Sequence, residues 1–253
     1  MSHAELILLL AGAVVAGFVQ GLSGFGFSMV AMSFWVWGLE PKLAAVMAVF
    51  GSLTGQLVGV FTVPRSLSWR ALAPFLAGGL LGIPLGMALL PRLDAQLFKL
   101  ALGLLLVVTC PAMLWAARLP SVALRSAAAT RVADGVAGLG GGFMGGLAGI
   151  TGVIPTLWCT LRGLDKAAQR SMIQNFNLAT LSVTMLAYVA SGAVTRAMWP
   201  LLPWVAVALA VPSLLGARLY HRLSDQGFRR VVLGLLTVMG VVMLISAAPS
   251  VIR

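Results

Sequence analysis

Two glycine-rich stretches are the most informative part of the chain: GFVQGLSGFGFSMV at residues 17–30 and GFMGGLAGITGVIP at residues 142–155. They align without a gap at an offset of 125 positions, and glycine matches glycine at Gly17, Gly21 and Gly24 of the first copy. Glycine weakens an α-helix and permits a turn, so each stretch predicts a break in a helix. The alignment indicates an internal repeat, a common feature of transporter folds.

Each glycine-rich stretch lies inside a long apolar segment, one at 4–38 and the other at 134–162. As a single helix the first segment would extend about 52 Å, because the rise is about 1.5 Å per residue. That length exceeds the roughly 30 Å hydrocarbon core of a bilayer, so we expect both segments to be broken. Six simpler apolar runs have the length of a membrane span and lie near residues 43–63, 70–90, 97–117, 167–190, 198–219 and 228–248.

The composition excludes a soluble globular protein. Hydrophobic residues make up 60 % of the 253 residues, charged residues make up 9 %, and the mean hydropathy is +1.02. Soluble domains contain about 45–50 % hydrophobic residues and about 25 % charged residues. The net charge of +11 arises because acids are few (6 against 17 bases). The bases are scattered singly through loops, which is typical of membrane topology and not of nucleic-acid binding. We therefore expect an all-α polytopic membrane protein whose partner is the lipid bilayer.

Two further residue types narrow the chemistry. Cys110 and Cys159 lie in apolar runs and are expected to be small buried hydrophobic residues. Their spacing predicts no disulfide framework, no metal site and no cofactor. All six acidic residues lie near segment ends, which disfavours a proton or sodium relay built on an intramembrane carboxylate.

The charge distribution chooses between two topologies. If both broken segments cross the membrane, the two faces carry ten and seven basic residues; if both are re-entrant hairpins, the faces carry twelve and five. The second distribution fits the positive-inside rule better and places both termini outside the cytoplasm. We expect a first repeat at 1–117, a basic connector at 118–131 and a second repeat at 132–253. Each repeat has one hairpin and three spans, and the odd number inverts the second repeat relative to the first.

The tips of the two hairpins are the candidate binding site. Backbone groups at membrane depth must be satisfied by protein or water, so each tip is expected to face a cavity. The second limb of each hairpin begins at its tip, and helix N-termini attract anions. The predicted anion cradle consists of Ser23, Gly24, Phe25, Gly26, Gly149, Ile150, Thr151 and Gly152. The alternative is that these glycines only permit close helix packing.

Polar residues follow each broken segment at helical spacing. Ser52 and Gln56 are four residues apart, and Arg170, Gln174 and Asn177 share one helix face. We expect these side chains to line the cavity, with Arg170 near its mouth, or to bond neighbouring helices.

An enzyme is the weaker interpretation. The tetrapeptide at 21–24 is a G-x-S-G sequence, which resembles the serine motif of rhomboid intramembrane proteases. A serine nucleophile needs a nearby base. The two histidines, His3 and His221, lie outside the predicted spans, and the second copy has Ala148 in place of the serine. We therefore expect no catalytic residue.

Two rows of glycines follow small-xxx-small spacing, one at Gly51, Gly55 and Gly59 and the other at Gly78, Gly82 and Gly86. Such rows indicate close helix packing and leave room for a homodimer.

The chain resembles the TauE/SafE family of sulfite and organosulfonate exporters. The resemblance rests on the duplicated glycine-rich breaks, on a Gly-Leu-acid turn after each (38–40 and 163–165), and on the second copy at 146–155. It implies export of a small sulfur-containing anion, such as sulfite, sulfoacetate or another sulfonate, across the bacterial inner membrane by alternating access. Two alternatives stay open: an anion channel or facilitator, and a membrane assembly protein without a substrate.

Overall fold

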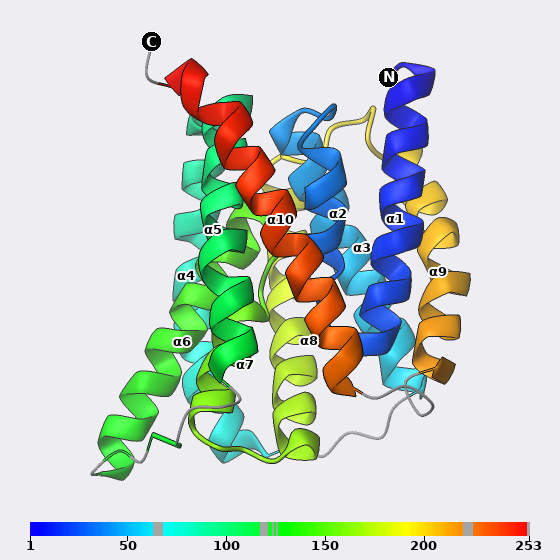
Figure 1. Cartoon of the computed structure of the whole chain (residues 1–253). Helices are drawn as coiled ribbons and strands as arrows, with labels where there is room; N and C mark the ends of the chain where they lie inside the picture. Colours follow the sequence, from blue (N-terminus) through cyan, green and yellow to red (C-terminus); the bar gives the residue numbers. More distant parts are fainter. Residues whose placement is uncertain (63–67, 117–120, 123, 125, 220–224, 252–253) are drawn as a thin grey trace.

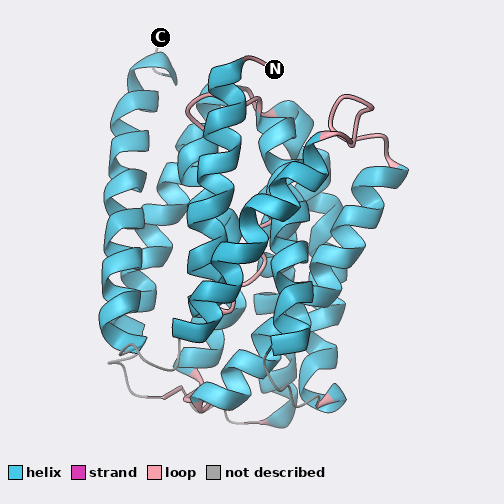
Figure 2. Ribbon diagram, turned by 90° about the vertical axis from the view of Figure 1, so that its right-hand side faces the viewer, coloured by secondary structure: helices cyan, strands magenta, loops and turns pink. Residues whose placement is uncertain are grey.

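The computed structural model describes residues 1–62, 68–116, 121–122, 124, 126–219 and 225–251, and no strand occurs among them. The helices form one bundle (Figures 1 and 2) and confirm the predicted all-α class. They are α1 His3–Ser23, α2 Phe27–Trp35, α3 Pro41–Thr62, α4 Trp69–Leu89, the 3-10 turn η1 Leu90–Arg92, α5 Ala95–Ala116, α6 Ala127–Ala148, α7 Val153–Leu161, α8 Lys166–Ala190, α9 Leu201–Leu219 and α10 Asp225–Val251.

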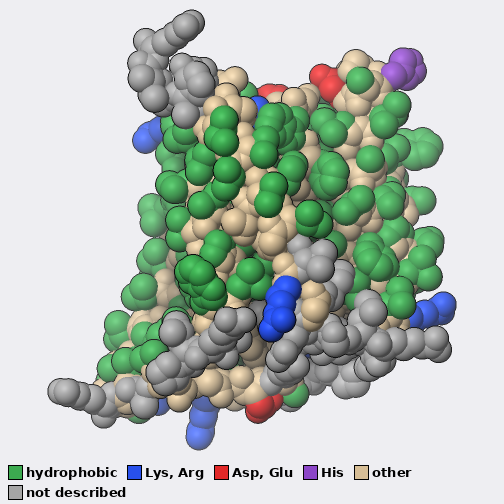
Figure 3. Space-filling model, in the orientation of Figure 1, with side chains coloured by type: hydrophobic (Ala, Val, Ile, Leu, Met, Phe, Trp, Pro, Cys, Tyr) green, Lys and Arg blue, Asp and Glu red, His purple; other side chains and the backbone are tan. Residues whose placement is uncertain are grey.

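On the face shown in Figure 3, hydrophobic side chains cover much of the bundle between its two ends, as the composition predicts for a multi-pass membrane protein. In the described part, five stretches are long and apolar enough to cross a membrane: His3–Ser23, Pro41–Val60, Trp69–Arg92, Ala95–Ala116 and Leu201–Leu219. The run expected at 167–190 does form the helix α8, but its polar residues keep it out of this set. α10 contains a shorter apolar stretch, Val232–Ala247.

Both long apolar segments are broken at their glycines. α1 ends and α2 begins around Gly24 and Gly26, which have φ angles of 78° and 102°. α6 ends at Gly149, which has a φ of 70°. Because L side chains are strained at positive φ, these turns require glycine. In Figure 1 the N-terminus and the end of α10 lie at the upper end of the bundle, whereas α6 begins at the lower end.

Residues 127–131, expected in the connector, form the first turns of α6. Arg118 and Arg125 of the same connector lie outside the described residues.

The helices pack in pairs that are distant in the sequence. α1 packs on α9, α4 on α6, α5 on α10 and α3 on α8. Glycine brings the first two pairs into backbone contact: a Cβ on Gly21 would lie 2.0 Å from the Ser213 carbonyl oxygen, and one on Gly146 would lie 2.2 Å from that of Ile83. Side chains at these glycines would force the helices apart.

The glycine rows are used inside the chain. A Cβ on any of Gly78, Gly82 or Gly86 would collide with backbone oxygen atoms of α6, while Gly51 faces the Phe27 ring and Gly55 faces Gln20. Both rows are therefore packing surfaces, as their spacing predicts, and they give no support to a homodimer.

Trp35 lies near the end of an apolar run, a position typical of tryptophans at the membrane interface. It is fully buried, and its indole N–H donates to the Leu9 carbonyl over 3.1 Å. This bond fastens the end of α2 to the first half of α1. The position of Trp35 in the sequence, close to a span end, does not distinguish a buried indole that joins two helices from one at the membrane interface.

Candidate functional site

The break between α1 and α2 is stabilised by side chains. The Ser23 hydroxyl donates to the Val19 carbonyl (2.8 Å) and accepts from the Phe25 N–H (3.3 Å). Gln56 of α3 donates through Nε2 to the Gly24 carbonyl over 3.0 Å. These contacts satisfy backbone groups that a broken helix would otherwise leave unpaired in an apolar surrounding.

The break between α6 and α7 is held in a similar way. Gly149 N–H donates to the Gly145 carbonyl over 2.8 Å. Tyr188 of α8 is buried, and its hydroxyl donates to the Gly146 carbonyl over 2.6 Å. The Thr151 hydroxyl donates to Asn177 Oδ1 over 2.8 Å. Both breaks are thus fixed by polar side chains from the long helix that follows the broken segment, α3 in the first case and α8 in the second.

A cavity with about 270 Å³ of free space lies between the two breaks, and we name it the central cavity. It brings together nine predicted site residues with five others. The predicted residues are Phe25, Gly26, Ser52, Gln56, Gly149, Ile150, Thr151, Gly152 and Asn177, and the others are Gln20, Ser28, Met29, Val153 and Leu181. None of these residues is acidic.

A second cavity, of about 280 Å³, lies beside the first and shares Gln20 and Gln56 with it. We name it the side cavity. Three more predicted residues line it: Gly24, Arg170 and Gln174. Its other lining residues are Gly21, Gly55, Gly59, Ser213 and Ala217. The sequence indicated one cavity, whereas the structure divides the predicted residues between two.

Ser23 is the one predicted site residue that lines neither cavity. Its hydroxyl is bonded within the turn, as described above.

Gln20 is the polar residue of the central cavity that sequence reasoning missed, and it lies beside the hydroxyls of Ser28 and Ser52. Gln20 is buried and donates to the Ser52 carbonyl over 3.0 Å, and the Ser28 and Ser52 hydroxyls lie 2.6 Å apart. The available signal was a lone glutamine four residues before Gly24, in an otherwise apolar run. Together these side chains form a hydrogen-bonded wall of the central cavity.

The N-termini of α2 and α7 both face the central cavity, because their N-cap residues, Gly26 and Gly152, line it. Neither cap makes a side-chain hydrogen bond, in contrast to Ser2, Ser126 and Asp165 at other helices. The first N–H groups of a helix have no partner within the helix and carry a partial positive charge. The cavity therefore has a positive local potential without a cationic side chain in its lining.

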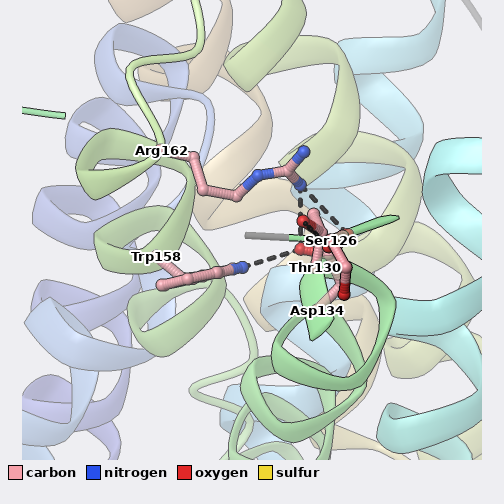
Figure 4. A network of polar contacts seen from close by, with 5 residues as sticks. All are labelled: Ser126, Thr130, Asp134, Trp158 and Arg162. Atoms are coloured by element: carbon pink, nitrogen blue, oxygen red, sulfur yellow. Dashed lines mark hydrogen bonds and ion pairs between the residues drawn. The ribbon is translucent and has the colours of Figure 1, made fainter. Parts of the chain in front are cut away.

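A second polar network lies outside both cavities (Figure 4). Asp134 of α6 is 4 % exposed. Its Oδ1 and Oδ2 accept hydrogen bonds from Arg162 Nη1 over 2.8 and 3.0 Å, and its Oδ1 also accepts from the indole N–H of Trp158 over 2.7 Å. The sequence placed Asp134 near a segment end and Arg162 in a loop. The structure instead pairs them, which fastens the first half of α6 to the end of α7.

Among the described residues, no group of three or more His, Cys, Asp or Glu side chains is placed to hold a metal ion.

An apolar helical bundle with a polar cavity at two helix breaks defines a multi-pass membrane protein of the transporter class. A comparison with known protein families identifies the family within this class. The model of the family described as Sulfite exporter TauE/SafE matches residues 9–243, and the chain belongs to this family of membrane transporters of sulfur anions. No curated protein and no solved structure matches the chain.

Proposed function

We propose that this protein exports small sulfur-containing anions, such as sulfite, sulfoacetate or another sulfonate, across the bacterial inner membrane by alternating access. The family supplies the substrate class. One structural observation carries the proposal: the N-termini of two short helices, α2 and α7, converge on one buried cavity.

Two converging helix N-termini suit an anion for electrostatic reasons. Their free N–H groups donate hydrogen bonds, and their dipoles favour negative charge. Gly26 and Gly152 permit a ligand to approach the backbone closely, since no Cβ covers it.

We further propose that the chain is two inverted repeats, each with a re-entrant hairpin and three helices. The helix contacts support this arrangement because they occur in mirrored pairs. α1 packs on α9 as α6 packs on α4, α5 on α7 as α10 on α2, and α3 on α9 as α8 on α4. The close approach of Gly21 to Ser213 likewise has its counterpart between Gly146 and Ile83.

The side cavity is the proposed route between the central cavity and the cytoplasm. Arg170 lies in the second turn of α8, which begins at the lower end of the bundle (Figure 1), and it lines the side cavity together with Gln56. A guanidinium there raises the local concentration of anions. Ser23 contributes by holding the turn at which the two cavities meet.

Export does not require an intramembrane carboxylate. A negative interior drives each negative charge outward by about 2.3 kcal/mol at 100 mV. Asp134, the buried acid among the described residues, is paired with Arg162 and lines neither cavity.

The test is anion flux in proteoliposomes that contain the purified protein, with an imposed membrane potential. The panel is sulfite, sulfoacetate, taurine, sulfate and chloride. We expect saturable movement of a sulfur oxyanion at a rate that increases with the potential. Unselective flux that includes chloride would identify a channel, and no flux of any anion would refute the proposed function.

A further inference from the structure

The side cavity contains a buried hydrogen-bond acceptor that the protein does not satisfy. Gln174 is 3 % exposed and lines this cavity, and its Oε1 has no hydrogen-bond partner among the described residues. An unmatched buried amide oxygen is costly, and native structures keep few of them. A ligand with a hydrogen-bond donor would satisfy it.

Gln174 and Arg170 converge on the same point of the α1–α2 break. A Cβ on Gly24 would lie 3.1 Å from Gln174 Nε2 and 3.5 Å from Arg170 Nε. The two side chains are one helical turn apart on α8, so they present a guanidinium and an amide side by side. The absence of a side chain at Gly24 is what allows both to reach the break.

The other two glutamines of the side cavity already use their side-chain N–H donors within the protein. Gln20 donates to the Ser52 carbonyl and Gln56 donates to the Gly24 carbonyl. The lining has no acidic residue to compete for a ligand's donor or to repel its charge. The side cavity therefore contains a buried acceptor without a partner among the described residues, Gln174 Oε1, beside the positive charge of Arg170.

We infer that the side cavity is a second anion subsite, and that it selects anions that also carry a hydrogen-bond donor. A protonated oxyanion such as hydrogen sulfite, or a hydroxylated sulfonate, has both groups. A fully deprotonated oxyanion presents only acceptor oxygens, which would repel Gln174 Oε1. This inference rests on the proposed function, because it specifies which sulfur anions the protein accepts.

Two sulfonates of equal charge and nearly equal size, one with a hydrogen-bond donor and one without, measure what the donor contributes to binding. Hydroxymethanesulfonate has a hydroxyl group where ethanesulfonate has a methyl group. Binding of each to the purified full-length protein is measured by titration calorimetry in detergent, at one pH. We expect hydroxymethanesulfonate to bind about tenfold more tightly, the value of one hydrogen bond to an otherwise unpaired buried acceptor.

The variant Gln174→Met removes the acceptor but keeps an unbranched side chain of similar length. We expect it to bind the two sulfonates equally, because the acceptor that distinguishes them is gone. Thr156→Val is the matched control, because Thr156 Oγ1 is also buried without a partner among the described residues but lies outside both cavities. The control is expected to keep the tenfold preference.

The outcomes separate this inference from the function on which it rests. If the wild-type protein binds both sulfonates equally, or prefers ethanesulfonate, the donor-selecting subsite is refuted while the anion site stands. If the preference survives in Gln174→Met, the acceptor is not Gln174 and the assignment is refuted. If neither sulfonate binds, the proposed function and this inference fail together.

Discussion

Asp134 shows at the scale of one residue how a charge is kept inside an apolar bundle. An isolated buried carboxylate is very costly, but Asp134 accepts two hydrogen bonds from Arg162 and one from Trp158. The residue that aligns with Asp134 at the offset of 125 is Leu9, whose backbone carbonyl accepts the indole N–H of Trp35. Each broken segment is therefore fastened by an indole N–H to an aligned position, once to a carbonyl and once to a carboxylate.

We predict that Asp134→Asn lowers the free energy of unfolding by about 2–3 kcal/mol, because Arg162 loses its ionic partner in a largely buried setting. Thermal unfolding of the purified protein in detergent measures the loss. Asp94→Asn is the control: Asp94 is exposed and caps α5 through the Leu97 N–H, a role that asparagine performs equally well. Equal unfolding temperatures for the two variants would contradict the importance of the buried pair.

We predict that Tyr188→Phe destabilises the second break by about 1–3 kcal/mol. The Gly146 carbonyl lies in the last turn of α6, where the helix supplies few N–H partners, and the Tyr188 hydroxyl provides one. Hydrogen exchange of residues 145–152, followed by mass spectrometry, should show faster exchange in the variant. Unchanged exchange there would mean that the hydroxyl does not hold the break.

At the scale of elements, the short helices α2 and α7 are the unusual parts of the bundle. Each has nine residues, too few to cross a membrane, and each begins at a glycine that lines the central cavity. A helix end in an apolar surrounding needs partners for its N–H groups. We interpret the uncapped ends as groups reserved for a ligand.

We predict that Gly152→Val abolishes saturable anion flux while the protein still folds. Gly152 has an ordinary helical conformation, but a Cβ there would lie 3.0 Å from Asn177 Nδ2 and cover the N-terminus of α7. Gly234→Val is the matched control, because nothing lies within 4 Å of a Cβ at Gly234 of α10. Flux in proteoliposomes is the measurement, and wild-type flux in Gly152→Val would exclude this helix end from the site.

At the scale of the whole molecule, the mirrored helix contacts and the opposite starting ends of α1 and α6 support the proposed hairpin topology, which labelling can test. Hairpins that return to their own side place Glu40 and Ala167 on opposite faces of the membrane. Broken segments that cross the membrane would place the two residues on the same face. Both residues are exposed, so both positions are accessible to a labelling reagent.

We predict that a membrane-impermeant thiol reagent labels Glu40→Cys only from the periplasm and Ala167→Cys only from the cytoplasm. The physical reason is the positive-inside rule, because the face near Ala167 carries most of the basic residues in the hairpin topology. Cys110 and Cys159 are buried and give little background in whole cells or inverted vesicles. Labelling of both variants from the same side would refute the re-entrant hairpins.

The helix breaks are determined by the sequence itself. Glycine at 24, 26 and 149 adopts the positive φ angles that other residues avoid, and this preference is local to the residue. The sequence also predicts the membrane class directly, since composition and the length of apolar runs depend on no long-range contact. The polar faces of α3 and α8 likewise follow from residue spacing. The five residues predicted on those faces all line a cavity: Ser52, Gln56, Arg170, Gln174 and Asn177.

Other features depend on which helices become neighbours. Asp134 and Trp35 lie near segment ends in the sequence, yet both are buried because α7 and α1 cover them. The division of the site into two cavities depends on where Gln20 of α1 meets α3, 32 residues further along the chain. Local patterns predict which face of a helix is polar. Which helix packs against that face depends on packing across the whole bundle, so no single stretch of sequence determines it.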